Sequence, residues 1–194
     1  EEYATGSMYV NSGDLELTYD TSNQTVGMRW VGLAIPPGAT ITAAWIQFSA
    51  KEAQSEVTNL TIRGQAADNP VAFSSSARIS PRPLTTATSA WAPAAWTAGQ
   101  AGASQRTPDL GAVIQEIVNR PGWVSGNAIA IIVSGTGHRT ARSFESVPAG
   151  AALLHIEMGG APPPPNTAPV VDAGPNQTIT LPASAPLFGT VSDD

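Results

Sequence analysis

Acidic side chains near the N-terminus have types and spacing that could do chemistry. Apolar and polar residues alternate from Asp14 to Tyr19, so Asp14 and Glu16 share one face of an expected strand. Together with Glu145 from a later strand, they could bind Ca²⁺, which takes six to eight oxygen ligands. We therefore predict a calcium site at Asp14, Glu16 and Glu145. The alternative is that these carboxylates are solvated or form ion pairs.

Paired carboxylates can also hydrolyse glycosides, but only when they flank a cleft with their carboxyl groups about 5 Å or about 6.5–9.5 Å apart. No long cleft-forming loops surround Asp14 and Glu16. His155 lies in an apolar run and is expected to pack within a strand, and His138 lies at a turn and is expected to be solvated. Ser134 lacks the preceding glycine that a nucleophile elbow needs. We expect no enzymatic activity, and a carboxylate-dependent glycoside-active enzyme is the third alternative for function.

Three tryptophans form the predicted carbohydrate site. Trp91 and Trp96 lie in an Ala/Pro-rich segment without strand periodicity, and Trp123 follows a Pro-Gly turn. Aromatic rings stack on the apolar C–H faces of sugars, so these three residues are predicted to bind a polysaccharide or cell-surface glycan. The alternative is that they seal an edge of the fold. Trp30 and Trp45 lie in expected strands and are predicted to be core residues.

The composition favours a β-rich extracellular protein. The chain of 194 residues has 18 Gly, 17 Pro and no Cys, and only 12% of its residues are charged. A net charge of −6 repels phosphate backbones, so we expect no nucleic-acid partner. The longest apolar stretch, residues 128–133, is far too short to span a membrane. The absence of Cys excludes disulfides and thiolate zinc sites.

Strand-like alternation dominates residues 1–160. The expected strands are 14–19, 26–30, 40–49, 57–64, 128–134, 139–144 and 151–158. One short amphipathic helix is expected, with Thr107 as its N-cap, Pro108 at its first position and apolar residues at helical spacing to Val118. The pattern predicts an all-β fold, an antiparallel jelly-roll-like β-sandwich with this helix packed across one edge or end.

A Pro-rich linker at residues 161–167 separates this module from a second segment. Four consecutive prolines, Pro162–Pro165, favour a polyproline II spacer. Residues 168–194 contain strand candidates at 170–171, 178–181 and 187–191, which is too little chain to form a core. We expect these C-terminal strands to belong to a partial repeat or to associate with a second chain through residues 166–194.

Several motifs support a resemblance to known families. The segments 166–183 and 187–194 resemble the opening strands of a bacterial PKD-like, immunoglobulin-like repeat. Residues 1–160 resemble β-sandwich modules of large secreted bacterial proteins. The segments that carry this second resemblance are 26–30, 35–39, 107–110, 115–123, 125–127 and 139–145.

The resemblance implies a secreted or bacterial cell-surface location. It also implies a non-catalytic role in glycan binding, adhesion or surface architecture of a larger protein. The alternative function is that of a structural subunit of an extracellular filament, joined to the next copy through its C-terminal strands.

Overall fold

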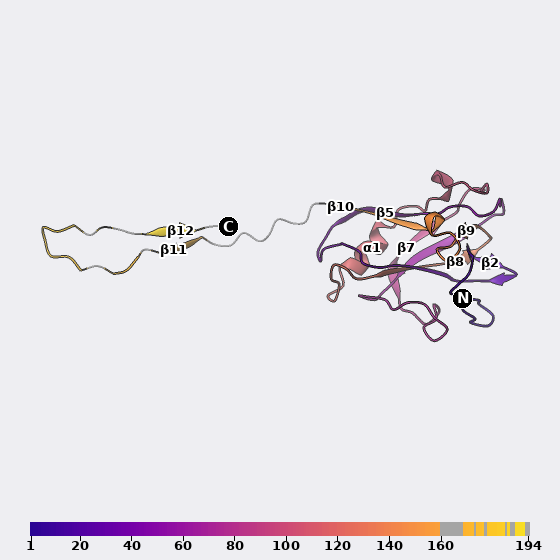
Figure 1. Cartoon of the computed structure of the whole chain (residues 1–194), viewed down its shortest axis with the longest axis horizontal. Coiled ribbons are helices and arrows are strands. Elements are labelled where there is room, and N and C mark those ends of the chain that lie inside the picture. The colour runs from indigo at the N-terminus through magenta and orange to yellow at the C-terminus, as the bar shows by residue number, and fades with distance from the viewer. Residues whose placement is uncertain (160–168, 173, 177, 185, 187–188, 193–194) are drawn as a thin grey trace. The chain divides into compact units, whose positions relative to one another are not determined.

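The computed structural model describes residues 1–159, 169–172, 174–176, 178–184, 186 and 189–192. The chain divides into two compact units, Glu1–Ala161 and Pro162–Asp194. Unit 1 is mostly β, with antiparallel sheets and one short α-helix, as the alternation predicts (Figure 1). None of the described helices has the length and apolar character needed to cross a membrane.

Unit 1 is built from one four-stranded sheet and three strand pairs. The four-stranded sheet has the order β4 (Val26–Trp30), β8 (Ile129–Thr136), β6 (Asn59–Gln65) and β7 (Leu84–Trp91). The pairs are β5 (Ile41–Gln47) with β10 (Leu153–Met158), β1 (Asp14–Glu16) with β9 (Thr140–Arg142), and β2 (Tyr19–Asp20) with β3 (Ser22–Asn23). All pairings are antiparallel.

Strand β7 was not expected from the sequence. Its residues are mainly Thr, Ala and Ser, so they lack the apolar alternation that marks a strand. It forms because its backbone pairs with β6, from Leu84 opposite Gln65 to Trp91 opposite Leu60. Trp91 is therefore the last residue of a strand and does not lie in a loop.

Strand β5 has neighbours on both edges. One edge pairs with β10. Along the other edge lies the segment 105–110, and the amide nitrogens of Phe48, Thr107 and Leu110 donate hydrogen bonds between this segment and β5 over 2.7–3.0 Å. Strand β5 therefore lies between β10 and the segment 105–110.

Because the segment 105–110 pairs with β5, the helix begins later than predicted. Helix α1 spans Gly111–Val118, so the expected start at Thr107 is wrong. The Thr107 hydroxyl accepts a hydrogen bond from the backbone nitrogen of Ile46, and the Asp109 carboxylate accepts one from the nitrogen of Ala44. These side chains bind strand β5 and leave Leu110 as the N-cap residue.

Helix α1 packs against β5, β6 and β7. Its buried apolar residues are those expected at helical spacing: Val113, Ile114, Ile117 and Val118. At β7, the edge strand, the Glu116 carboxylate accepts hydrogen bonds from the amides of Thr86 and Ala87. The predicted packing role of the helix is confirmed, and Glu116 also satisfies donors of an exposed strand edge.

A single hydrophobic core is shared by several strands of unit 1. This core contains Ile46 of β5 and Phe48, which directly follows β5. It also contains Ile62 of β6 and Ile129 and Ile131 of β8. Figure 1 shows β5 and β10 along the top of the domain, with α1, β7 and β8 below them. Side chains of the four-stranded sheet and of β5 are therefore buried in the same core.

In unit 2, β11 (Val170–Asp172) pairs with β12 (Thr190–Ser192). Val170, Val171 and Val191 are 68–70% exposed, so this pair buries little apolar surface. The expected strand at 178–181 is wrong, because these residues lie outside any strand. The predicted linker 161–167 and residues 187–188 lie outside the described residues.

Candidate functional site

The three tryptophans predicted to bind carbohydrate are buried. Trp91, Trp96 and Trp123 are only 6%, 2% and 2% exposed. The indole nitrogen of Trp96 donates to the Ser104 carbonyl oxygen at 2.9 Å, and that of Trp123 to the Ile35 carbonyl oxygen at 3.0 Å. Their rings offer no face on which a sugar could stack, so their arrangement corresponds to the packing alternative.

Phe48 brings two of these tryptophans together. Its ring lies 5.7 Å from that of Trp91, at an interplanar angle of 11°, and 6.2 Å from that of Trp96. Trp91 and Trp96 are also 6.2 Å apart. This aromatic cluster closes one part of the core, whereas Trp123 is buried separately against the Ile35 backbone.

The predicted calcium ligands lie on and next to paired strands. Strand β1 carries Asp14 and Glu16 and pairs with β9, so the first and late strands are neighbours. The Asp14 carboxylate forms an ion pair with Lys51, and Glu145 is exposed just beyond β9. In the part of the chain that the structure describes, no three Asp, Glu or His side chains gather into a metal-binding group. Calcium binding stays a prediction.

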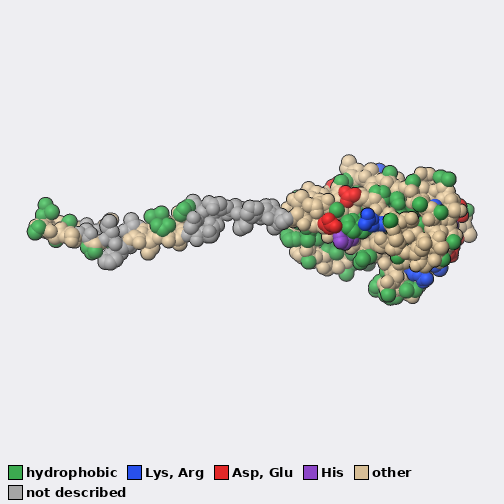
Figure 2. All heavy atoms as spheres, turned by 90° about the horizontal axis from the view of Figure 1, so that it is seen from above, with side chains coloured by type: hydrophobic (Ala, Val, Ile, Leu, Met, Phe, Trp, Pro, Cys, Tyr) green, Lys and Arg blue, Asp and Glu red, His purple; other side chains and the backbone are tan. Residues whose placement is uncertain are grey.

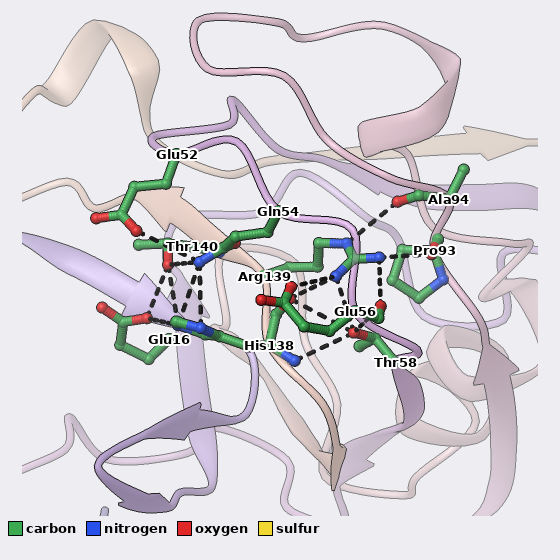
Figure 3. A network of polar contacts seen from close by, with 10 residues as sticks. All are labelled: Glu16, Glu52, Gln54, Glu56, Thr58, Pro93, Ala94, His138, Arg139 and Thr140. Carbon is green, nitrogen blue, oxygen red and sulfur yellow. Dashed lines mark hydrogen bonds and ion pairs between the residues drawn. The ribbon is translucent and has the colours of Figure 1, made fainter.

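Glu16 belongs to a polar network (Figure 3). Its Oε2 atom lies 2.6 Å from Nε2 of His138 and accepts a hydrogen bond from the Thr140 hydroxyl at 2.9 Å. The Gln54 amide donates to the same hydroxyl at 2.7 Å and accepts from the Thr140 backbone nitrogen at 2.6 Å. His138 is thus held by the network, and the prediction that it is solvated is wrong: its side chain is only 27% exposed.

Next to this network, the guanidinium of Arg139 is buried (Figure 3). It donates hydrogen bonds to the carbonyl oxygens of Pro93, Ala94 and Glu56 and to the Thr58 hydroxyl, over 2.9–3.2 Å. Burial lowers the pKa of Arg139, and the nearby Glu56 carboxylate partly opposes this shift. The Arg139 side chain therefore connects three segments of the chain. A lysine could not replace it, because an ammonium lacks the five N–H donors of a planar guanidinium.

The network is suited to structure more than to chemistry. The Thr140 hydroxyl, placed between a carboxylate and an imidazole, is fully buried and out of reach of a substrate. The carboxylate, amide and guanidinium groups of Glu16, Gln54 and Arg139 bind neighbouring parts of the chain. The network joins β1 and β9 to the segments 52–58 and 93–94.

A different cluster lies on the outer face of β5 and β10. We call it the Trp45 face, and its members are Trp45, Gln47, Leu153, His155, Glu157 and Arg106. The half-buried Trp45 ring stacks on His155, with centroids 3.9 Å apart and an interplanar angle of 21°. Nε2 of His155 lies 3.2 Å from Oε1 of Glu157. The Arg106 guanidinium carbon lies 4.7 Å from the centroid of the Trp45 ring.

Strand order explains this arrangement. His155 is the direct partner of Trp45 on β10, and Arg106 lies opposite Gln47 on the other edge of β5. Trp45 is therefore contacted by His155 from one edge of β5 and by Arg106 from the other edge. Figure 2 looks onto the side on which β5 and β10 lie in Figure 1, and it shows a histidine among acidic, basic and apolar side chains.

Sequence reasoning missed this face. It placed Trp45 in the core and His155 inside a packed strand, but Trp45 is half-buried and the His155 side chain is 43% exposed. A signal was present in the alternation of residues 43–49. Ile46 and Phe48 are buried, whereas Trp45 has the same parity as the polar residue Gln47. The large apolar side chains on both faces concealed this pattern.

Comparisons with known proteins assign no family to this chain. No protein-family model matches the sequence, and no curated protein matches it. The function is therefore argued from the geometry.

Proposed function

We propose that unit 1 is a jelly-roll-like β-sandwich that binds polysaccharide through the Trp45 face. The sandwich is supported by the core shared between the four-stranded sheet and the β5–β10 pair. The protein is a non-catalytic, extracellular module of a bacterial surface protein and serves glycan binding, adhesion or surface architecture. The observation that carries the proposal is the half-buried Trp45 ring on an outer sheet face, flanked by His155 and Arg106.

The chemistry of the Trp45 face matches that of a sugar. Sugars present apolar C–H groups beside hydroxyl groups, and their sites combine aromatic surface with a few polar groups. Trp45 and Leu153 supply apolar surface, while His155, Glu157 and Arg106 supply hydrogen-bond donors and acceptors. Four of these residues lie in β5 or β10, and Arg106 forms a backbone bridge with Gln47 of β5. The site is therefore held by rigid elements.

A glycan array probed with the whole chain tests the proposal, followed by affinity electrophoresis on the polymers that bind. Trp45→Ala should abolish binding without unfolding the domain, because its ring is not part of the buried core. Tyr3→Ala is the matched control, since Tyr3 is an exposed aromatic residue outside β5 and β10. Absence of binding to every glycan, or binding that survives Trp45→Ala, would contradict the proposal.

A filament subunit is the second candidate function, and unit 2 favours it. Two paired strands of three residues each are not stable alone in water. The valines of this pair are exposed, so a further strand beside them would bury apolar surface and pair open backbone groups. Size-exclusion chromatography with light scattering distinguishes the two candidates, because a filament subunit forms concentration-dependent oligomers and a binding module stays monomeric.

A further inference from the structure

Arg106 is one of the arginines of the described chain that form no ion pair with a carboxylate. Lys51, Arg78, Arg120 and Arg139 lie in ion pairs with carboxylates. Among the ion pairs formed by the described residues, none includes Arg106. Its guanidinium instead lies over the Trp45 ring, and the residue is exposed. The outer face therefore carries a positive charge that no carboxylate of the described chain neutralises.

The backbone holds Arg106 in a defined position. Its own amide donates to the carbonyl oxygen of Ala103, and the residue forms a bridge with Gln47 of β5. Hydrogen bonds from Phe48 to Gln105 and from Thr107 to Ile46 hold the residues before and after it. With the backbone paired and the guanidinium resting on an indole, little conformational entropy remains to be lost when a ligand binds.

The acidic group of the Trp45 face lies on the other side of the tryptophan. Glu157 is on β10, across β5 from Arg106, and it pairs with His155 at 3.2 Å. The nearby Asp109 carboxylate accepts hydrogen bonds from the amides of Ala44 and Gly111. Neither carboxylate is therefore used to neutralise Arg106.

From this geometry we infer that the Trp45 face selects sugars that carry a carboxylate, namely uronic acids within a polysaccharide. The inference rests on the proposed function and names its ligand class. A guanidinium that stacks on an aromatic ring keeps its N–H groups at its edge, where two of them fit the two oxygens of a carboxylate. The net charge of −6 repels a polyanion at long range, so the selectivity must come from this direct contact.

The test compares matched polymers that differ in carboxylate charge: polygalacturonate against its methyl ester, and glucuronoxylan against unsubstituted xylan. The full chain should bind at least one charged polymer about tenfold or more tightly than its neutral counterpart. Arg106→Gln should remove this preference and leave weak binding to the neutral form. Arg106→Lys should restore it only in part, because an ammonium lacks the planar fork.

Arg63→Gln is the matched control, because Arg63 is an exposed arginine on β6 and its loss changes the net charge equally. Equal loss of preference in this variant would show a general charge effect and overturn the inference. Tighter binding of the neutral polymers would overturn the inference and leave the proposed function standing. If no glycan bound in the array or in this comparison, both proposals would fail. Unchanged melting temperatures of the variants confirm that their folds are intact.

Discussion

The imidazole of His155 on β10 stacks on the indole of Trp45 on β5, with 3.9 Å between ring centroids and an interplanar angle of 21°. The two residues are direct cross-strand partners on the outer face of the β5–β10 pair. Aromatic pairs of this kind stabilise a sheet by about 0.2–1 kcal/mol. Here the pair also places an aromatic surface beside Arg106 and Glu157, which is the basis of the proposed binding site.

The tryptophans should separate into two classes when truncated. Trp96→Ala and Trp123→Ala should each lower the free energy of unfolding by about 3–5 kcal/mol, because each removes a buried aromatic ring. Trp45→Ala should cost less, since its ring is half-buried on the outer face. Urea denaturation of the three variants measures the difference. Equal losses in all three would mean that Trp45 is a core residue.

Arg139 should be essential for stability. Arg139→Met removes the guanidinium donors that bind the carbonyl oxygens of Pro93 and Ala94 and the Thr58 hydroxyl. Because buried acceptors are then left unpaired, we expect a loss of about 3–5 kcal/mol in the free energy of unfolding. Arg63→Met, an exposed arginine replaced by the same residue, should change it by less than about 0.5 kcal/mol. Similar urea midpoints for both variants would contradict a bracing role for Arg139.

Calcium can be tested by melting temperature. A site with a hundredfold excess of Ca²⁺ over its Kd would add about 2.7 kcal/mol to the free energy of unfolding. If the predicted site exists, added Ca²⁺ should raise the melting temperature and a chelator should lower it, although Ca²⁺ must displace Lys51 from Asp14 and His138 from Glu16. A rise with Ca²⁺ that Asp14→Asn and Glu16→Gln remove would establish the predicted calcium site, and an unchanged melting temperature would contradict it.

Unit 2 gives a prediction about association. If its strands dock on a second copy, Val191→Asp should abolish concentration-dependent oligomers, because it places a charge on the exposed apolar strand β12. Val57→Asp adds the same charge at an exposed valine of unit 1 and should leave the oligomers unchanged. Light scattering across a range of protein concentrations measures both variants. A wild-type chain that stays monomeric throughout would rule out the filament function.

Much of unit 1 could be predicted from local sequence. Alternation located β4, β5, β6, β8, β9 and β10 to within a few residues, and the spacing from Leu110 to Val118 located the buried face of α1. These patterns are readable because each depends only on neighbours along the chain. Strand β7 was missed because its small polar residues carry no such pattern, and it is a strand only because β6 lies beside it.

The candidate sites were decided by tertiary structure. The sequence by itself determined that the chain is β-rich, that one helix buries an apolar stripe, and that Asp14 and Glu16 are carried by one strand. It could not determine which tryptophans face solvent, because that depends on which distant segments cover them. Phe48 and Ser104 bury Trp91 and Trp96, whereas β10 and Arg106 leave Trp45 half-buried beside charged groups. Burial is a property of long-range pairing, so only the folded chain distinguishes a core tryptophan from one that can meet a ligand.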